Sequence, residues 1–247
     1  MIMLQDFFTE DSLNIFTDAS MNSYGNCACT GVCPVYGKID KRFPLLNTSI
    51  NTRVIKNCTN NFAEGRAIID AIYIAAVNKD KFNTIRIISD SQISIYGIRD
   101  RIVKWKTSKK KDKDGFVNFV GSQGYIKNQD IFLEALYTIL DYNLSIEFLH
   151  QAGHVSMINT DSLMKSAETF KRSNGILDDL DIELLRSLAF YNNYVDRNSR
   201  DVLYSTDIYS LKTYFPFKYK VYEGYDKSTY ARLVNPENSI FTKEVKK

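Results

Sequence analysis

The sequence predicts an α/β protein built around one mixed five-stranded sheet that is flanked by helices. Three strand patterns joined by turn residues come first, which favours an antiparallel meander for these three strands. Helical and strand patterns then alternate, which is typical of parallel strands joined by right-handed crossovers. The 247 residues, 44% of them hydrophobic, are enough to bury a core without disulfides or a metal.

Alternating and continuous apolar runs place the strands. They are expected at residues 13–20, 26–38, 45–55, 84–89 and 144–149. Apolar residues at helical spacing predict the helices, at residues 59–77, 92–105, 128–142 and 160–170. Thr59 or Asn60 is a good N-cap for the first helix. Residues 106–124 form an exposed excursion between the second and third helices.

The composition changes after Arg172, which divides the chain into a unit of residues 1–172 and an extension of residues 173–247. Residues 176–194 are a helix candidate, and residues 215–222 alternate apolar and polar side chains. Nine of the 16 Tyr lie after residue 190, so we expect the extension to be folded or docked. It could stack on bases, bind a protein partner or cover the sheet, and the sequence does not decide among these.

Composition also excludes several classes of protein. No run of 18 apolar residues exists, and the N-terminus carries acids where a signal peptide carries basic residues. Cys27, Cys29 and Cys33 share one short run, and buried free thiols in a reducing compartment explain them better than a disulfide framework. We therefore expect a monomeric cytoplasmic protein, and the Ile-, Asn-, Lys- and Tyr-heavy usage hints at a bacterium or a virus of one.

Four acids from separate segments are expected to gather at one edge of the sheet. Asp18 and Asp90 each end a strand, Glu64 lies near the start of a helix, and Asp161 opens another. Carboxylates so close together repel one another, and hard divalent cations such as Mg²⁺ relieve that repulsion. Two such ions could cleave a phosphodiester. Strand-end Asp residues are also common turn formers, and Asp161 alone could be a helix N-cap.

Six ordered motifs over residues 12–171 resemble the ribonuclease H family, type 1. They are T-D-A-S at 17–20, T-N-N-x-x-E at 59–64, S-D-S-Q at 89–92, a Trp-Lys pair before a Lys-rich excursion at 105–113, K-N-x-D at 127–130, and A-G-H at 152–154 with Asp seven residues later. The resemblance implies this family's fold, two Mg²⁺ ions with Mn²⁺ as a substitute, and hydrolysis of the RNA strand of RNA–DNA hybrids. The products would carry 3′-hydroxyl and 5′-phosphate ends.

The resemblance also implies roles for individual residues. The metal-binding and catalytic acids would be Asp18, Glu64, Asp90 and Asp161. Asn60, Asn61 and Gln92 would read the minor groove of the hybrid, where amides can contact 2′-hydroxyls. Thr59 and Asn128 would hold a phosphate of the DNA strand. Capping is the alternative role for Asn60 and Asn61.

The sequence departs from the family pattern in the loop before the helix at 160–170. The family writes G-H-x-G-H, whereas this chain has His150-Gln-Ala-Gly-His154. His154 keeps the second histidine, and Gln151 replaces the first, which in the family assists turnover. His150, one position earlier, either substitutes for it or only ends a strand. Tyr24 replaces a second groove-reading Asn, which puts strictness for the hybrid in question.

A cluster of charge marks the excursion, although the net charge of the chain is only +3. Residues 99–113 hold eight basic side chains against two acidic ones. We expect this segment to bind a phosphate backbone, in a salt-dependent manner, rather than to be only a solvated loop. The residues expected to contact substrate there are Lys104, Trp105, Lys106, Lys109 and Lys110.

Three functions are weighed from these features. The first is hydrolysis of the RNA strand of hybrids. The second is a related nuclease of the same fold that cuts DNA junctions or other RNA. The third is a non-catalytic protein that binds nucleic acid or docks a partner, against which the intact acids argue.

Overall fold

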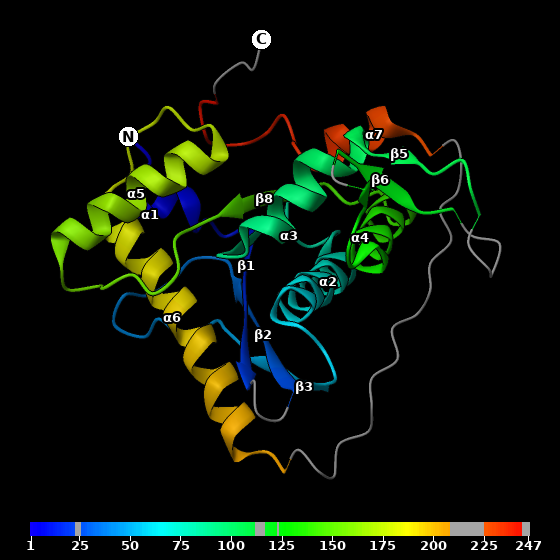
Figure 1. Ribbon diagram of the computed structural model, residues 1–247. Coiled ribbons are helices and arrows are strands. Elements are labelled where there is room, and N and C mark those ends of the chain that lie inside the picture. Colours follow the sequence, from blue (N-terminus) through cyan, green and yellow to red (C-terminus); the bar gives the residue numbers. More distant parts are fainter. Residues whose placement is uncertain (23–25, 112–116, 123, 208–224, 244–247) are drawn as a thin grey trace.

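The computed structural model describes residues 1–22, 26–111, 117–122, 124–207 and 225–243. The main sheet has five strands, and its elements are β1 (Ser12–Asn22), β2 (Cys27–Tyr36), β3 (Asn51–Lys56), β4 (Thr84–Ser89) and β8 (Glu147–His150). Their order is β3-β2-β1-β4-β8 (Figure 1). The first three strands pair antiparallel, and β1, β4 and β8 pair parallel. The expected mixed sheet is confirmed.

The strand register brings Asp18 and Asp90 to the same end of the pairing between two neighbouring strands. β1 pairs with β4 up to Thr17 opposite Ser89, so the next residues, Asp18 and Asp90, stand at the same edge. On its other side, Asp18 is opposite Gly31 of β2. Side-by-side strands thus deliver two acids that are 72 positions apart in the sequence to one place.

One face of the sheet is covered by α2 (Asn60–Asn78), α3 (Gln92–Tyr96) and α4 (Gln129–Asp141) (Figure 1). Ala-rich and Ile-rich stripes of these helices bury the main core against β1 and β4. The short α7 (Lys227–Leu233) also joins this core, because Tyr230 is fully buried and donates its hydroxyl to the carbonyl of Ile98.

The other face is covered by α6 (Ile182–Ser205), a 24-residue helix that contacts β1, β2 and β3 (Figure 1). Leu188, Tyr191 and Val195 pack from it onto Phe16 of β1 and form the second core. The helix begins six residues later and ends eleven residues later than the sequence indicated. The structure therefore differs from a division at residue 172, since the residues after it supply one layer of the same core.

The remaining elements are short or peripheral. They are α1 (Leu4–Phe7), α5 (Thr160–Asn174), and a small sheet of β5 (Lys106–Thr107), β6 (Phe119–Gly121) and β7 (Gly124–Tyr125). The helix expected at 92–105 is broken: α3 is followed by a π-helical turn at Gly97–Arg101 and a 3-10 turn at Ile102–Lys104. Gly97 lies against Phe132, whose ring a Cβ would approach to 2.2 Å. The alternating run at 215–222 is outside the described residues.

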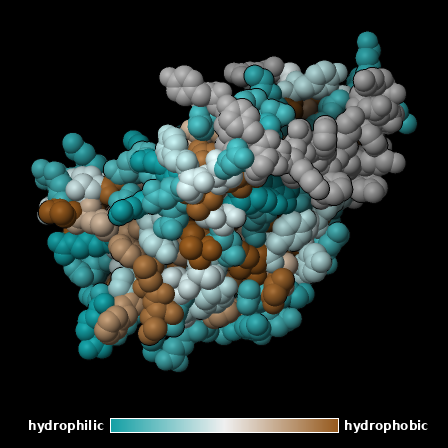
Figure 2. Space-filling view, turned by 90° about the horizontal axis from the view of Figure 1, so that it is seen from below, coloured by the Kyte–Doolittle hydropathy of each residue, from teal (hydrophilic) through white to brown (hydrophobic). Residues whose placement is uncertain are grey.

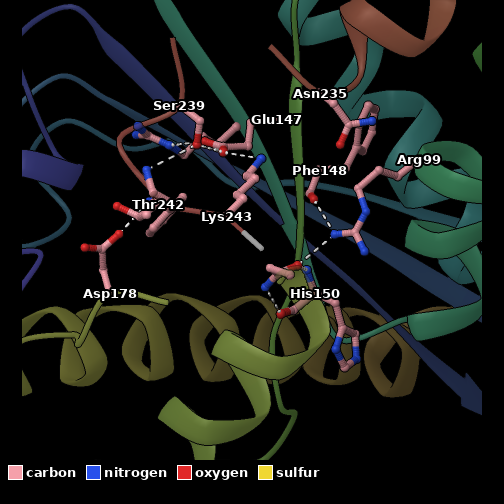
Figure 3. Close-up of polar contacts among 12 residues, drawn as sticks. Arg99, Glu147, Phe148, His150, Asp178, Asn235, Ser239, Thr242 and Lys243 are labelled. Carbon is pink, nitrogen blue, oxygen red and sulfur yellow. Dashed lines mark hydrogen bonds and ion pairs between the residues drawn. The ribbon is translucent and has the colours of Figure 1, made fainter. Parts of the chain in front are cut away.

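Buried polar contacts tie the C-terminal segment and the end of α5 to β8 (Figure 3). Glu147 accepts from Arg86 and Ser239 and pairs with Lys243, which holds the C-terminal segment against the sheet. Asn174, at the end of α5, accepts from the backbone N–H of His150 and donates to its carbonyl. Arg99 donates to the same Asn174 and to the carbonyl of Phe148. These bonds satisfy polar groups that burial would otherwise leave unpaired.

All four cysteines are buried and free, which confirms the expectation of buried thiols. Within the described parts of the chain, no helix combines the length and the apolar character that a bilayer crossing needs. In Figure 2, which shows the molecule from below, apolar residues lie in several separate groups among hydrophilic ones.

Candidate active site

A small polar pocket of about 240 Å³ opens where β1 and β4 present their acids. Four carboxylates line it, and each comes from a different element: Asp18 from β1, Glu64 from α2, Asp90 from the end of β4, and Asp196 from α6. The other lining residues are Ala19, Ser20, Met21, Asn60, His154, Arg200, Leu203 and Tyr204. The pocket lies between the α2 face and the α6 face of the sheet.

Burial and mutual repulsion disfavour the charged forms of the two strand-end acids. Burial raises the pKa of Asp18 to about 8, with further contributions from the charges of Asp90, Asp196 and Glu64. Burial and the charge of Glu64 raise the pKa of Asp90 to about 6, against a lowering by His154. The pocket thus holds two carboxyls whose ionised forms are unfavourable, Asp18 and Asp90, whereas Asp196 is paired with Arg200.

Glu64 is held by two neighbours. Asn60 Nδ2 donates to its Oε1 at 2.5 Å, and Ser91 Oγ donates to its Oε2 at 2.6 Å. The Thr59 side chain caps α2 by accepting from the N–H of Phe62 at 3.3 Å. Capping fixes where the helix starts, and Glu64 therefore reaches the pocket from its second turn.

Asp196 is the site residue that the sequence interpretation missed. Its two oxygens accept from Arg200 Nη2 at 2.9 and 2.8 Å, and His154 Nδ1 lies 3.5 Å from its Oδ2. The helical spacing could have identified it. Asp196 lies on the face of α6 that packs on the sheet, four residues after the buried Asn192 and three before the buried Ser199. An acid among the buried positions of a helix indicates a functional or pairing role.

Asp161 lies elsewhere. It is exposed on the first turn of α5, the side chain of Asn159 caps that helix, and Asp161 does not line the pocket. The structure therefore puts Asp196 where the sequence put Asp161. The physical reason is that α6, not α5, packs along β1.

The two histidines have different environments. His150 is 8% exposed at the end of β8, and its Nε2 is 3.2 Å from the backbone carbonyl of Asp90. Burial lowers its pKa, which favours the neutral imidazole; the residue ends β8 behind Asp90 and does not line the pocket. His154 lines the pocket, with its side chain 73% exposed. A Cβ at the neighbouring Gly153 would be 2.4 Å from Asp90 Oδ2, so a larger residue at this position would push the Asp90 carboxylate aside.

A larger groove of about 1170 Å³ adjoins the pocket at the N-terminus of α2. Asn60 lines the pocket, whereas its neighbours Thr59 and Asn61 line the groove, so the two meet there. Other expected substrate residues that line the groove are Lys104, Trp105, Lys106 and Asn128. Lys109 and Lys110 line a separate shallow hollow. Gln92 is exposed at the start of α3 and lines neither the pocket nor the groove, and Lys113 is outside the described residues.

The pocket suits a hard divalent cation by its chemistry, since it offers carboxylate oxygens with unrelieved charge. As the side chains stand, no group of three or more His, Cys, Asp or Glu in the described parts of the chain is arranged to hold a metal. Asn60 and Ser91 occupy both oxygens of Glu64, and Arg200 occupies both oxygens of Asp196. A cation must therefore displace these bonds to be held by all four acids.

Gly31 lets α6 approach the sheet beside Asp18. A Cβ at this position would be 2.2 Å from Ser199 Oγ and 2.7 Å from Val195 Cγ1. We predict that Gly31→Ala pushes α6 outward, costs about 1–3 kcal/mol of unfolding free energy, and weakens Mg²⁺ binding because Asp196 moves with the helix. Urea unfolding and calorimetric Mg²⁺ titration measure both effects. Ser199→Ala, which only removes an atom, is the control, and equal behaviour of the two variants would contradict the prediction.

Removing the charge of Asp18 should stabilise the metal-free protein. A carboxyl whose pKa rises from 3.8 to about 8 on folding destabilises the fold increasingly as the pH climbs between those values. Asp18→Asn should therefore gain on the order of 5 kcal/mol at pH 8, because the pKa difference between 3.8 and about 8 is worth about 1.4 kcal/mol for each pKa unit, and little at pH 4. Urea unfolding in EDTA at both pH values tests this, with the exposed Asp161→Asn as the matched control. A gain that is the same at both pH values would refute it.

The fold and the site define an α/β protein with an acidic pocket over the ends of β1 and β4. Residues 10–168, more than half of the chain, match the model of the family described as RNase H. The chain belongs to the RNase H family.

Two solved structures illustrate the likeness. One is a crystal structure of LC11-RNase H1 in complex with an RNA/DNA hybrid, 17% identical, with a TM-score of 0.40, covering 65% of this chain and 98% of that one. The other is LC11-RNase H1 isolated from compost, 17% identical, with a TM-score of 0.39, covering 66% and 96%. A comparison with curated proteins finds no match.

Proposed function

We propose that this protein hydrolyses the RNA strand of RNA–DNA hybrids with the help of two divalent metal ions, Mg²⁺ or Mn²⁺. The observation that carries the proposal is the convergence of four carboxylates from four elements in one pocket that opens next to a basic groove. Family membership supports nuclease chemistry. The motifs at residues 17–20, 59–64 and 89–92 resemble those of type 1 members, whose substrate is the hybrid.

Asp18, Glu64, Asp90 and Asp196 would hold the ions. Bound there, two Mg²⁺ ions supply activation of the attacking water and stabilisation of the leaving oxygen. Their charge also relieves the repulsion that raises the pKa values of Asp18 and Asp90. Ser91 and Asn60 orient Glu64 until then, and His154 stands at the rim beside Asp196.

The groove would hold the uncleaved strand. Arg101, Lys104, Lys106 and Lys127 line it and provide charge for phosphates. Thr59 and Asn61 add polar contacts at the end nearest the pocket, and Asn128 adds another in the groove. Trp105 is less available than the sequence suggested, because its ring packs on Phe119 and Phe132. Cytoplasmic location, a monomeric state and a protein partner for residues 173–247 stay predictions.

Substrate choice tests the proposal directly. Labelled RNA–DNA hybrid, double-stranded RNA, double-stranded DNA and a four-way DNA junction are incubated with the protein and Mg²⁺, in parallel with Asp18→Asn. We expect cleavage of the hybrid RNA strand alone, and none by the variant. Cleavage of the junction but not the hybrid would overturn the proposal, and equal cleavage by Asp18→Asn would expose a contaminating nuclease.

A further inference from the structure

The last three turns of α6 carry two pocket-lining side chains, Arg200 and Tyr204, to which the nuclease chemistry described above gives no role. Asp196, Arg200 and Tyr204 are spaced by four residues, which puts them on one face of the helix, and all three line the acidic pocket. They form the wall of the pocket opposite Asn60 and Glu64 of α2. We propose that Arg200 and Tyr204 bind the RNA strand beside the scissile phosphate, an inference that rests on the proposed function.

Arg200 has the chemistry and the freedom for a phosphate contact. Only Nη2 of its guanidinium has a hydrogen bond among the described residues, to the two oxygens of Asp196. Its side chain is 51% exposed, so it can turn toward the pocket mouth. A guanidinium presents five donors in a planar fork that matches two phosphate oxygens. When a cation takes over Asp196, the arginine is released next to the strand being cut.

Tyr204 supplies a surface for a base or a ribose. It is 70% exposed at the last turn of α6, whereas its neighbour Leu203 is buried against Cys27 and Cys29. The buried Leu203 anchors the turn, and the tyrosine at the next position is left largely exposed at the pocket edge. Because the bases of a hybrid are paired, the part of the strand that such an exposed ring can contact beside a phosphate-binding group is the ribose, or a base at the end of the duplex.

The position of the wall points to the RNA strand. The basic groove lies on the α2 side of the pocket, and α6 covers the opposite face of the sheet (Figure 1). A hybrid whose uncleaved strand lies in the groove places its other strand over the pocket, so the continuation of that strand passes α6. Arg200 and Tyr204 would thus extend the binding tract beyond the cut site, on the side away from the Lys-rich excursion.

Binding and kinetics of single variants test this. In the Asp18→Asn background, Arg200→Ala and Tyr204→Ala should each weaken affinity for the hybrid roughly five- to tenfold, measured by fluorescence anisotropy with Mg²⁺. Tyr204→Phe keeps the ring and should bind normally. Arg197→Ala is the matched control, because Arg197 lies on the outer face of the same helix with its side chain 83% exposed, and it should stay within about twofold.

Kinetics on hybrids of different length distinguish a direct contact of Arg200 and Tyr204 with the RNA strand from a purely structural role of these residues. With Asp18 intact, the two alanine variants should raise KM, and shortening the hybrid from one end should remove their difference from the native protein. A fall in kcat with unchanged KM at every length, or affinity equal to that of Arg197→Ala, would overturn the inference. If the native protein cleaves no hybrid, the proposed function fails. If it cleaves normally and the Arg200 and Tyr204 variants behave like the native protein, only the proposed RNA-binding role of these two residues is rejected.

Discussion

Asp196→Asn should lower the rate of hybrid cleavage about a hundredfold or more, a loss typical of removing one charge-stabilising group from an active site. Asn keeps the shape of the side chain and its bond to Arg200 but gives up the charge that a cation needs. Asp161→Asn should stay within about threefold, because its carboxylate is exposed on α5 and does not line the pocket. Single-turnover cleavage of a labelled hybrid measures both rates.

Metal binding checks the cause of this difference. Calorimetric titration with Mg²⁺ should show weaker binding for Asp196→Asn and native binding for Asp161→Asn. The reverse outcome, with loss at residue 161 only, would restore the ligand set expected from the sequence and remove α6 from the site. Circular dichroism of both variants guards against a loss of fold.

A chain that ends at Arg172 should not fold. The deletion removes α6, whose Leu188, Tyr191 and Val195 are buried against the sheet. Each large apolar side chain contributes about 1.5–3 kcal/mol when buried, so the three together approach the 5–15 kcal/mol that a typical domain has in total. The deletion also strips the cover from Phe16 of β1. Expression should yield insoluble protein, or soluble protein without a cooperative thermal transition.

Point variants on α6 distinguish the loss of its packing on the sheet from the mere shortening of the chain. Val195→Asp puts a charge on the face that meets Gly31 and should prevent folding as the deletion does. Arg197→Ala, two residues on but on the exposed face, should melt within about two degrees of the native protein. A soluble, cooperatively unfolding 1–172 fragment that binds hybrid would show that residues 173–247 are a separate unit after all.

Periodicity and turn chemistry were sufficient for the sheet. The three antiparallel strands, the parallel pairs and the helices on the α2 face follow from local apolar spacing, and the register then brings Asp18 and Asp90 together. The motifs also placed Glu64, Asn60 and His154, which line the pocket in the structure. These residues sit within or next to elements that short-range patterns define well.

The broken helix after α3 and the start of β3 depended on packing. Apolar spacing continues through residues 92–105, yet Gly97 must pass close to Phe132, and the helix changes its hydrogen-bond pattern there. The residues around Gly97 do not indicate that Phe132, 35 positions later, packs against it. The N-terminal part of the expected third strand likewise does not continue β3: residues 51–56 form the ladder with β2, and before them Thr48 makes an isolated bridge to Val35.

What the sequence determined by itself is the class of fold and three of the four acids in the pocket, because strands, caps and their adjacent carboxylates are encoded locally. What the tertiary structure decided is the fourth acid. Asp161 lies on α5 and Asp196 on α6, and the local sequence of neither helix predicts which of the two packs along β1. The glycine at position 31 and the apolar face of α6 settle that choice through long-range packing, and Asp196 reaches Asp18 as a result.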